Sequence, residues 1–285
     1  MKRRNLIKAV SAGLIIPTPA LSEALWPSSL IHDTEPKSTL LGGSDSHVRD
    51  SLYTPAAAVV EKIPDVVFNR GRKKLLTQTT QRLRRLQRYV GYGNFNLISY
   101  DRAMYYARNY SSIGAFTRDE KKFLDEVFFS DAHRYGFFGA KVTSKINARI
   151  KVRDTLKVPR SGHYVYQGAP LAMYKQIRRD IGKKLVLTSG IRGVVKQMYL
   201  FLNKTLSTGG NLSVASRSLA PPGHSYHGIG DFDVGKIGLG RNNFTSQFAN
   251  TDEFKRLIEL GYVAIRYPDG NPYGVRYEPW HIKVV

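Results

Sequence analysis

The sequence of 285 residues contains no cysteine. This absence excludes disulfide bonds, zinc sites built from thiolates, iron–sulfur clusters and a cysteine nucleophile. Any bound metal ion would therefore be held by histidine, aspartate or glutamate side chains. Acidic residues are also scarce: 22 Asp and Glu stand against 44 Lys and Arg, which gives a net charge of +22. This excess points to an anionic partner, either nucleic acid, a membrane surface or an acidic cell-envelope polymer.

The sequence shows no internal repeat, and its length suits one large domain or two smaller ones. Hydrophobic residues make up 42% of the chain and aromatic residues 11%. These fractions are typical of a protein with a buried core, and they exclude a chain that is mostly disordered and basic.

The amino terminus has the layout of an export signal. Residues 1–8 are basic, residues 9–21 are modestly apolar, and small residues follow up to Ala24. The apolar stretch is too short for a transmembrane helix, and Pro17 and Pro19 interrupt it. We therefore expect an exported protein that acts in the periplasm or cell envelope.

The paired arginines Arg3 and Arg4 resemble those of a twin-arginine signal, which exports folded proteins; a Sec signal or an uncleaved anchor is the alternative. Residues 1–24 hold four basic residues and one acidic residue, so their removal leaves a net charge of +19. The mature protein is therefore basic in its own right. Export favours envelope polymers or a membrane surface as partners over nucleic acid.

Composition and periodicity divide the chain into four segments. Residues 1–24 are the export signal, residues 25–56 a linker or loose arm, and residues 57–160 a basic, mainly helical accessory region. Residues 161–285 mix helices with short strands that predict a small antiparallel sheet. The expected fold class is therefore α+β, with a mostly helical amino-terminal region before a small antiparallel-sheet domain.

Two helices are expected in the accessory region. Residues at spacings of three and four between Leu76 and Val90 form one buried stripe, and basic residues occupy the other faces. Thr117 with Glu120 three residues later forms a capping box that predicts a second helix. The stripe comprises Leu76, Thr79, Leu83, Leu86 and Val90, and the basic residues are Arg72, Lys73, Lys74, Arg82, Arg84, Arg85 and Arg88.

The carboxy-terminal domain shows helical and extended patterns in alternation, and the extended ones include a candidate hairpin. The expected elements are helices over residues 169–181, 193–203 and 251–260, strands over 184–188 and 232–234, and a hairpin of strands 262–267 and 277–284 around the turn 268–272.

Two motifs in this domain could hold an anion and a metal ion. Arg192 lies between a predicted strand and a predicted helix, where a guanidinium can bind a carboxylate through two hydrogen bonds. Further on, a glycine-rich turn carries His227, and the strand after it carries Asp231 and Asp233. One histidine nitrogen and one aspartate oxygen could bind zinc from these positions. Taken singly, each residue is more often a surface or structural one.

A third motif near the end of the chain contains Glu278 and His281. On a regular strand, residues three apart face opposite sides, but Pro279 disturbs that geometry, so both side chains can reach one site. A glutamate that is not a ligand suits metal-assisted hydrolysis as the general base. The other histidines lack such spacing and are expected to be surface or structural, with His224 nearest the rim of the site: His32, His47, His133, His163 and His224.

Together these motifs resemble the three signatures of the LAS-type zinc D-alanyl-D-alanine carboxypeptidases, the VanY-like peptidases. That family shows Ser-Gly-Tyr-Arg followed by Gln, then Ser-x-His with a downstream Asp, then Glu-Pro-Trp-His. Residues 189–192, 225–233 and 278–281 match these signatures in the same order, and residues 254–268 are similar to the family's connecting segment. The resemblance covers roughly residues 161–285.

The resemblance implies a peptidase domain that binds Zn²⁺ and hydrolyses peptide bonds in peptidoglycan stem peptides. It implies a role for seven residues, namely His227, Asp233 and His281 as zinc ligands, Glu278 as the base, Arg192 as the partner of the substrate's carboxylate, and Gln197 and Ser225 as lining of its site.

Two departures from the family pattern concern the metal site and the pocket. Five residues separate His227 from Asp233, where the family usually has six, so Asp231 is a reserve candidate for the ligand. Asp233 is preferred because it lies within the predicted strand. Ile191 replaces the usual aromatic residue, which weakens any prediction of the pocket's shape.

The leading functional hypothesis is a D,D-carboxypeptidase that removes terminal D-Ala. The same machinery would serve a D,D-endopeptidase or an L,D-carboxypeptidase. A non-catalytic basic module that binds the envelope is an alternative of a different class, favoured by the shortened spacing. A third class is nucleic-acid binding through the basic helix around residues 72–88, which could equally bind envelope anions or be a solvated helix face.

Overall fold

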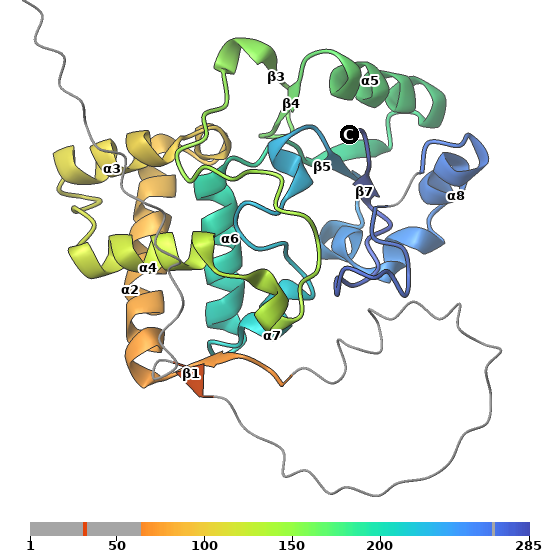
Figure 1. Ribbon diagram of the computed structural model, residues 1–285. Helices are drawn as coiled ribbons and strands as arrows, with labels where there is room; N and C mark the ends of the chain where they lie inside the picture. The colour runs from red at the N-terminus through yellow and green to blue at the C-terminus, as the bar shows by residue number, and fades with distance from the viewer. Residues whose placement is uncertain (1–30, 33–63, 264–265) are drawn as a thin grey trace, which may run out of the picture.

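The computed structural model describes residues 31–32, 64–263 and 266–285 (Figure 1). The predicted export signal lies outside these residues. So does the predicted linker, except for β1 (Ile31–His32), which pairs antiparallel with β2 (Val67–Phe68). Within the described part of the chain, no helix combines the length and the apolar character that crossing a membrane requires.

The accessory region is helical, as predicted. Its longest helix, α2 (Arg70–Val90), begins after Asn69, whose side-chain oxygen accepts a hydrogen bond from the backbone N–H of Arg72. The expected stripe from Leu76 to Leu86 is buried, and Val90 at the helix end is partly buried. The spacing of three and four therefore identified the face that packs inward.

The predicted capping box is confirmed at the start of α4 (Arg118–Phe129). The Thr117 hydroxyl accepts a hydrogen bond from the backbone N–H of Glu120, and the Glu120 carboxylate accepts one from the backbone N–H of Thr117. Two backbone donors that a helix end leaves without partners are satisfied in this way. The region also contains α3 (Tyr100–Asn109), which Ser99 caps.

Two of the arginines assigned to the outer faces of α2 point inward instead. Arg72 is buried and pairs with Glu126 of α4. The Arg82 side chain is 16% exposed, and its Nε lies 2.9 Å from Glu120, which is 2% exposed. Both arginines join α2 to α4, so the assignment of the whole basic set to a solvated face is wrong at these positions. Hydrophobic periodicity missed them because an arginine can be buried when a carboxylate is its partner.

The carboxy-terminal half contains a three-stranded antiparallel sheet in the order β5-β6-β7. Strand β5 (Leu185–Ser189) and strand β6 (Phe232–Lys236) lie within one or two residues of their predicted positions. The short strand β7 (His281–Ile282) pairs with the other edge of β6, so that His281 lies opposite Asp233. The α+β architecture is confirmed.

The predicted hairpin of residues 262–267 and 277–284 is wrong. None of the described residues in 262–267 belongs to a strand, and β7 pairs with β6 rather than with this segment. Asn271 closes the intervening turn, because its side-chain amide donates to the carbonyl oxygens of Pro268 and Val275. The alternating pattern marked positions that pack on the core, but the backbone partner of the last strand lies elsewhere in the sequence.

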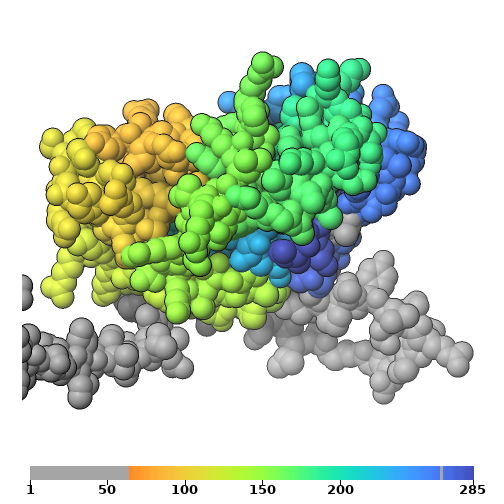
Figure 2. All heavy atoms as spheres, turned by 90° about the horizontal axis from the view of Figure 1, so that it is seen from above, coloured from red at the N-terminus to blue at the C-terminus, as the bar shows by residue number. Residues whose placement is uncertain are grey.

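Two apolar clusters make up the core, and α6 (Val194–Ser207) connects the two halves of the chain. Its residues Val195, Met198 and Phe201 belong to the cluster of the amino-terminal helices, and α2 and α6 run side by side in Figure 1. The second cluster lies between the sheet and the helices α5 (Ala169–Ile181) and α8 (Asp252–Glu259). In Figure 2 the amino-terminal helices occupy one end of the molecule and α8 the other.

The remaining elements are short and connect these helices and strands. They are the strands β3 (Thr155–Lys157) and β4 (Tyr164–Tyr166), the helix α7 (Leu212–Ser216), and the 3₁₀ helices η2 (Asn94–Asn96), η3 (Ala132–Tyr135), η4 (Val152–Asp154), η5 (Tyr226–Gly228), η6 (Gly240–Phe244) and η7 (Ser246–Asn250).

Glu120→Ala is expected to destabilise the protein, because it removes the acceptor of both the capping box and the Arg82 ion pair. Breaking a buried pair costs about 3 kcal/mol, at the lower end of the usual range because Arg82 keeps some contact with water. Urea denaturation followed by circular dichroism measures the change in the free energy of unfolding.

Asp119→Ala is the matched control, because Asp119 is exposed in the same first turn of α4. It should lose only the interaction of a carboxylate with the helix dipole, less than about 1 kcal/mol. Equal destabilisation by the two substitutions would contradict the role of the buried pair.

Candidate metal centre and substrate cleft

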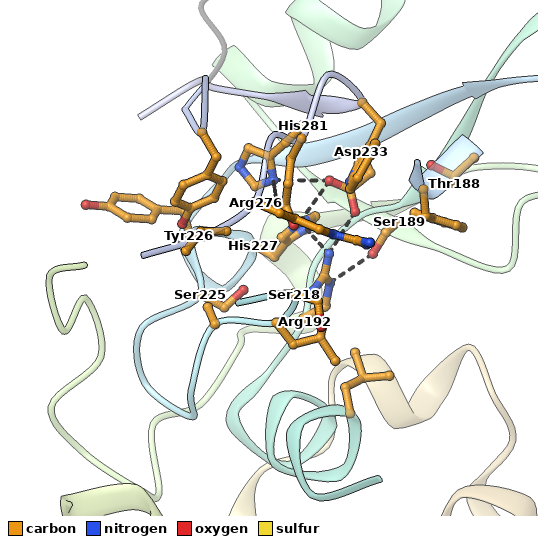
Figure 3. Close-up of a pocket in the computed structure, with 18 of the residues that line it drawn as sticks. Thr188, Ser189, Arg192, Ser218, Ser225, Tyr226, His227, Asp233, Arg276 and His281 are labelled. Atoms are coloured by element: carbon orange, nitrogen blue, oxygen red, sulfur yellow. Dashed lines mark hydrogen bonds and ion pairs between the residues drawn. The ribbon is translucent and has the colours of Figure 1, made fainter. Parts of the chain in front are cut away.

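A cavity of about 370 Å³ lies between α6, the loop that carries His227, and the carboxyl end of the chain. Polar side chains from these three segments converge in it (Figure 3). Of the seven residues that the sequence singled out, the cavity is lined by six, namely Arg192, Ser225, His227, Asp233, Glu278 and His281.

Three of these residues form a buried cluster of potential metal ligands: His227, Asp233 and His281. Each offers one ligand atom, and the three atoms lie within 4.8 Å of one another. Asp233 Oδ1 is 3.1 Å from Nε2 of His227 and 3.1 Å from Nδ1 of His281. The separation of five residues between His227 and Asp233 is therefore compatible with convergence of their side chains.

The backbone brings the cluster together in two ways. The pairing of β6 with β7 sets Asp233 directly opposite His281, so their side chains share one face of the sheet. His227 lies in η5, close to the end of β5, where the backbone N–H of Arg192 donates to its carbonyl oxygen. Gly190 allows β4 to approach the same end of β5, because a Cβ atom there would clash with the carbonyl oxygen of Tyr164.

Each histidine is oriented by a hydrogen bond at the ring nitrogen that faces away from the cluster. Nδ1 of His227 lies 2.8 Å from the carbonyl oxygen of Gly190, which can only accept, so Nδ1 carries the proton. Nε2 of His281 lies 3.0 Å from the Asp231 carboxylate and donates to it in the same way. The other ring nitrogens, Nε2 of His227 and Nδ1 of His281, each lie 3.1 Å from Asp233 Oδ1, which is the arrangement of metal-binding histidines. Arg192 Nη2 also lies 2.5 Å from Nε2 of His227.

Asp231, the reserve candidate for the ligand, faces away from the cluster. Its carboxylate accepts hydrogen bonds from Arg266 Nε at 2.6 Å and from the backbone N–H of Val284 at 2.8 Å, besides the bond from His281. Burial raises its pKa, but the bonds from His281 and Arg266 hold the pKa of Asp231 well below the ordinary value. Asp231 is therefore a carboxylate that orients His281.

The donor set fits a zinc ion. Asp233 Oδ1 is fully buried and accepts no hydrogen bond of acceptable geometry, although both ring nitrogens lie 3.1 Å away. A buried carboxylate oxygen without a hydrogen bond is costly unless a cation binds it. Two imidazole nitrogens and one carboxylate oxygen are ligands that zinc prefers, and three protein ligands leave a position open for water or substrate.

Glu278 lies beside the three potential metal ligands but is not one of them. The turn through Pro279 and Trp280 brings its Oε2 to 4.0 Å from Nδ1 of His281, so the two side chains reach one cavity, as predicted. Burial raises the pKa of Glu278 to about 7, although His281 acts in the opposite direction. A carboxyl group with this pKa can both accept and release a proton near neutral pH.

Arg192 brings a positive charge to the edge of the cluster. Its Nη2 donates to Asp233 Oδ2 at 2.7 Å, and its Nε donates to the Ser189 hydroxyl at 3.0 Å. Burial raises the pKa of Asp233, but His227 and Arg192 hold it well below the ordinary value, so Asp233 is an anion. Burial, together with Arg192, lowers the pKa of His227 to about 4, which leaves its ring neutral.

Comparison with known proteins identifies this part of the chain. Residues 166–285 match the family model of VanY, D-alanyl-D-alanine carboxypeptidase. This segment resembles the VanY family. No curated protein matches the chain significantly.

Three solved structures are similar to the chain. The LdcB LD-carboxypeptidase, described in connection with peptidoglycan recognition, is 25% identical with a TM-score of 0.38, over 46% of this chain and 63% of that one. A mutant of the vancomycin resistance D,D-pentapeptidase VanY in complex with Zn(II) is 20% identical with a TM-score of 0.35, over 50% of this chain and 86% of that one. VanYB in complex with D-alanine-D-alanine is 19% identical with a TM-score of 0.38, over 53% and 86%.

The two residues expected to line the substrate site lie in different surroundings. Ser225 lines the main cavity and also a neighbouring one of about 210 Å³. Gln197 lines only the neighbouring cavity, where its side-chain amide donates to the carbonyl oxygen of Ala220. The structure therefore does not bring Gln197 into the cavity that contains the potential metal ligands His227, Asp233 and His281.

The structure adds His163 to the cavity, where the sequence predicted only a surface or structural residue. Burial, together with the nearby charges of Arg192 and Lys196, lowers its pKa to about 4. No signal in the sequence could have indicated this position, because His163 precedes a short strand outside the three motifs. His224, which the sequence placed nearest the rim of the site, is buried beside the carbonyl oxygen of Gly139 and does not line the cavity.

Asp231→Asn is expected to weaken zinc binding about 10- to 100-fold, because an amide cannot accept all the hydrogen bonds that orient His281 and secure its neighbours. Competition with a chromophoric zinc chelator measures the affinity. Asp233→Ala removes a proposed ligand and should lose more affinity than Asp231→Asn. Wild-type affinity in Asp231→Asn would refute the orienting role, and thermal unfolding of the metal-free proteins checks that both variants fold.

Proposed function

We propose that the protein is a zinc-dependent D,D-carboxypeptidase that removes the terminal D-Ala from peptidoglycan stem peptides. The observation that carries the proposal is the buried cluster of His227, Asp233 and His281, with Glu278 and Arg192 beside it in one cavity. The match of residues 166–285 to a D-alanyl-D-alanine carboxypeptidase family supports the choice of substrate.

His227, Asp233 and His281 would hold the zinc ion through Nε2, Oδ1 and Nδ1. When bound, zinc lowers the pKa of water and polarises a carbonyl group. The chain contributes the orientation of the ligands, because Gly190 and Asp231 each hold one histidine ring by hydrogen bonding.

Glu278 would act as the general base and then as the general acid. In its ionised form it takes a proton from the attacking water, and the peptide nitrogen receives that proton as the terminal D-Ala departs. A pKa of about 7, raised by burial, suits both steps. The 4.0 Å between its Oε2 and His281 Nδ1 keeps the carboxylate next to the metal cluster without making it a ligand.

Arg192 would bind the terminal carboxylate of the substrate. This carboxylate lies only three bonds beyond the scissile carbonyl carbon, so its partner must adjoin the metal cluster. The guanidinium meets this condition, because its Nη2 contacts Asp233 and His227 and its Nε contacts Ser189, which leaves the N–H groups of Nη1 for the substrate. Ser225 would line the same site.

The proposed substrate also accounts for the charge of the chain. A net charge of +22, or +19 without residues 1–24, would retain an exported enzyme near an anionic envelope. The helical accessory region would contribute exposed basic residues to this attraction. Arg72 and Arg82, which pair with carboxylates of α4, would take no part.

Glu278→Gln should reduce the release of D-Ala from defined muropeptides by about 10³-fold, because the amide cannot accept the proton of water. Mass spectrometry of the digests measures the release and identifies the bond cut. Loss of one terminal D-Ala supports the D,D-carboxypeptidase. Cleavage of cross-links or of an L,D bond would indicate the two related activities instead.

Glu278→Gln should bind zinc as the wild type does, which separates a catalytic effect from loss of the metal. Lys175→Met, on the exposed side of α5, is a control that should keep full activity. Unchanged hydrolysis in Glu278→Gln would refute the assignment of the base.

Removal of the metal is expected to abolish hydrolysis. Dialysis against a strong chelator should leave a folded, inactive protein, and stoichiometric Zn²⁺ should restore activity, whereas Mg²⁺ should not, because two imidazole ligands favour zinc. Elemental analysis of the untreated protein should find one bound zinc per chain. Hydrolysis that resists the chelator in a zinc-free protein would exclude the zinc mechanism. A purified protein with neither bound zinc nor hydrolysis would instead favour the non-catalytic module.

A further inference from the structure

A row of basic side chains extends the cavity away from the metal cluster. Lys196, Leu200 and Lys204 lie four residues apart on α6, and all three line the cavity together with Arg192, which precedes the helix. Residues four apart share one face of a helix, so this row forms a continuous wall of the cleft. Arg276, labelled in Figure 3, lines the cavity from another segment.

The cleft contains more positive than negative charge. The carboxylates that line it are Asp233 and Glu278, and both belong to the metal centre. Within the described part of the chain, no carboxylate lies within 4.0 Å of the side-chain nitrogens of Lys196, Lys204 or Arg276. The three cations therefore remain available to an anionic ligand.

Lys196 is the most confined of these cations. Its ammonium group lies 5.7 Å from the ring centre of Phe95 and 5.9 Å from that of Tyr199, and its charge acts on the neighbouring His163. Burial, together with the charge of Arg192, lowers the pKa of Lys196 to about 8. A partly buried ammonium group without a carboxylate partner is costly, and a substrate carboxylate would offset that cost.

We propose that Lys196, supported by Lys204 at the far end of the row, binds a second carboxylate of the substrate, so that the enzyme prefers acidic peptides. This inference rests on the proposed function, because Arg192 is taken to bind the terminal carboxylate. The substrate class is a peptide that ends in D-Ala-D-Ala and carries a free carboxylate on one of the residues before them.

The length of the row matches such a peptide. Lys196 and Lys204 are eight residues apart, which corresponds to about 12 Å along a helix. An extended peptide advances about 3.3 Å per residue, so the row spans three to four residues of substrate. Carboxylates two or three residues before the terminal one would therefore lie along α6.

The test compares matched pentapeptides that end in D-Ala-D-Ala and differ only at the second and third residues, which carry either free carboxylates or carboxamides. The zinc-loaded wild type should hydrolyse the acidic peptide with a kcat/KM at least about tenfold higher than that of the amidated peptide, mainly through KM, as expected for one charge-assisted hydrogen bond. Lys196→Met should lose most of this preference, so that its kcat/KM on the acidic peptide falls towards its own value on the amidated peptide.

Two further variants separate charge from packing. Lys196→Arg keeps the positive charge and should retain the preference for the acidic peptide. Lys175→Met removes a lysine of the exposed face of α5, away from the cleft, and should leave the preference unchanged. Thermal unfolding confirms that each variant folds.

The outcomes distinguish this inference from the proposed function. Equal hydrolysis of both peptides by the wild type, or an undiminished preference in Lys196→Met, would overturn the second carboxylate site and leave the carboxypeptidase in place. If neither peptide is cut, the proposed function fails. Calorimetric titration of the zinc-loaded protein with each peptide then tests the second carboxylate site by itself. Binding of the acidic peptide at least about tenfold tighter supports the site, and equal affinity overturns it.

Discussion

The antiparallel pairing of β6 with β7 is the constraint on which the site depends. In this register Asp233 lies opposite His281, and the pairing with β5 sets Ser189 on the other side of Asp233. Phe232 and Val234, on either side of Asp233, are fully buried in the second apolar cluster. Because side chains alternate along a strand, a slip of one residue would expose both apolar residues and turn Asp233 away from the histidines. Hydrophobic burial on one face therefore secures the polar cluster on the other.

Helix α6 links the accessory region to the cleft. One face contributes Met198 and Phe201 to the core shared with the amino-terminal helices, and another presents Lys196 and Lys204 to the cavity. The packing of α2 against α6 thus determines where the basic wall of the cleft lies. The accessory region is part of the scaffold of the site, whatever else its exposed basic residues bind. Stability of the helical half and the geometry of the cleft are coupled through this one helix.

The many Lys and Arg side chains of the protein fall into groups with different roles. Some cations are internal: Arg72 and Arg82 join α2 to α4, and Arg266 pairs with the carboxylate that orients His281. Others line the cleft, where Arg192 contacts the metal cluster and Lys196 is confined beside aromatic rings. The remainder is exposed and contributes to long-range attraction. A net charge read from composition cannot separate these groups, because each depends on whether a carboxylate lies nearby in space.

The sequence by itself determined the helices with strong periodicity or capping signals, the strands β5 and β6, and the residue types of the metal cluster. Short-range patterns suffice for these, since helix caps and apolar stripes involve residues only a few positions apart. Only the tertiary structure decided that β7 pairs with β6 instead of forming a hairpin, that Asp231 orients His281, and that His163 and Lys196 enter the cleft while Gln197 does not. These outcomes depend on contacts between residues distant in the sequence, and the register and packing that create such contacts are properties of the whole fold.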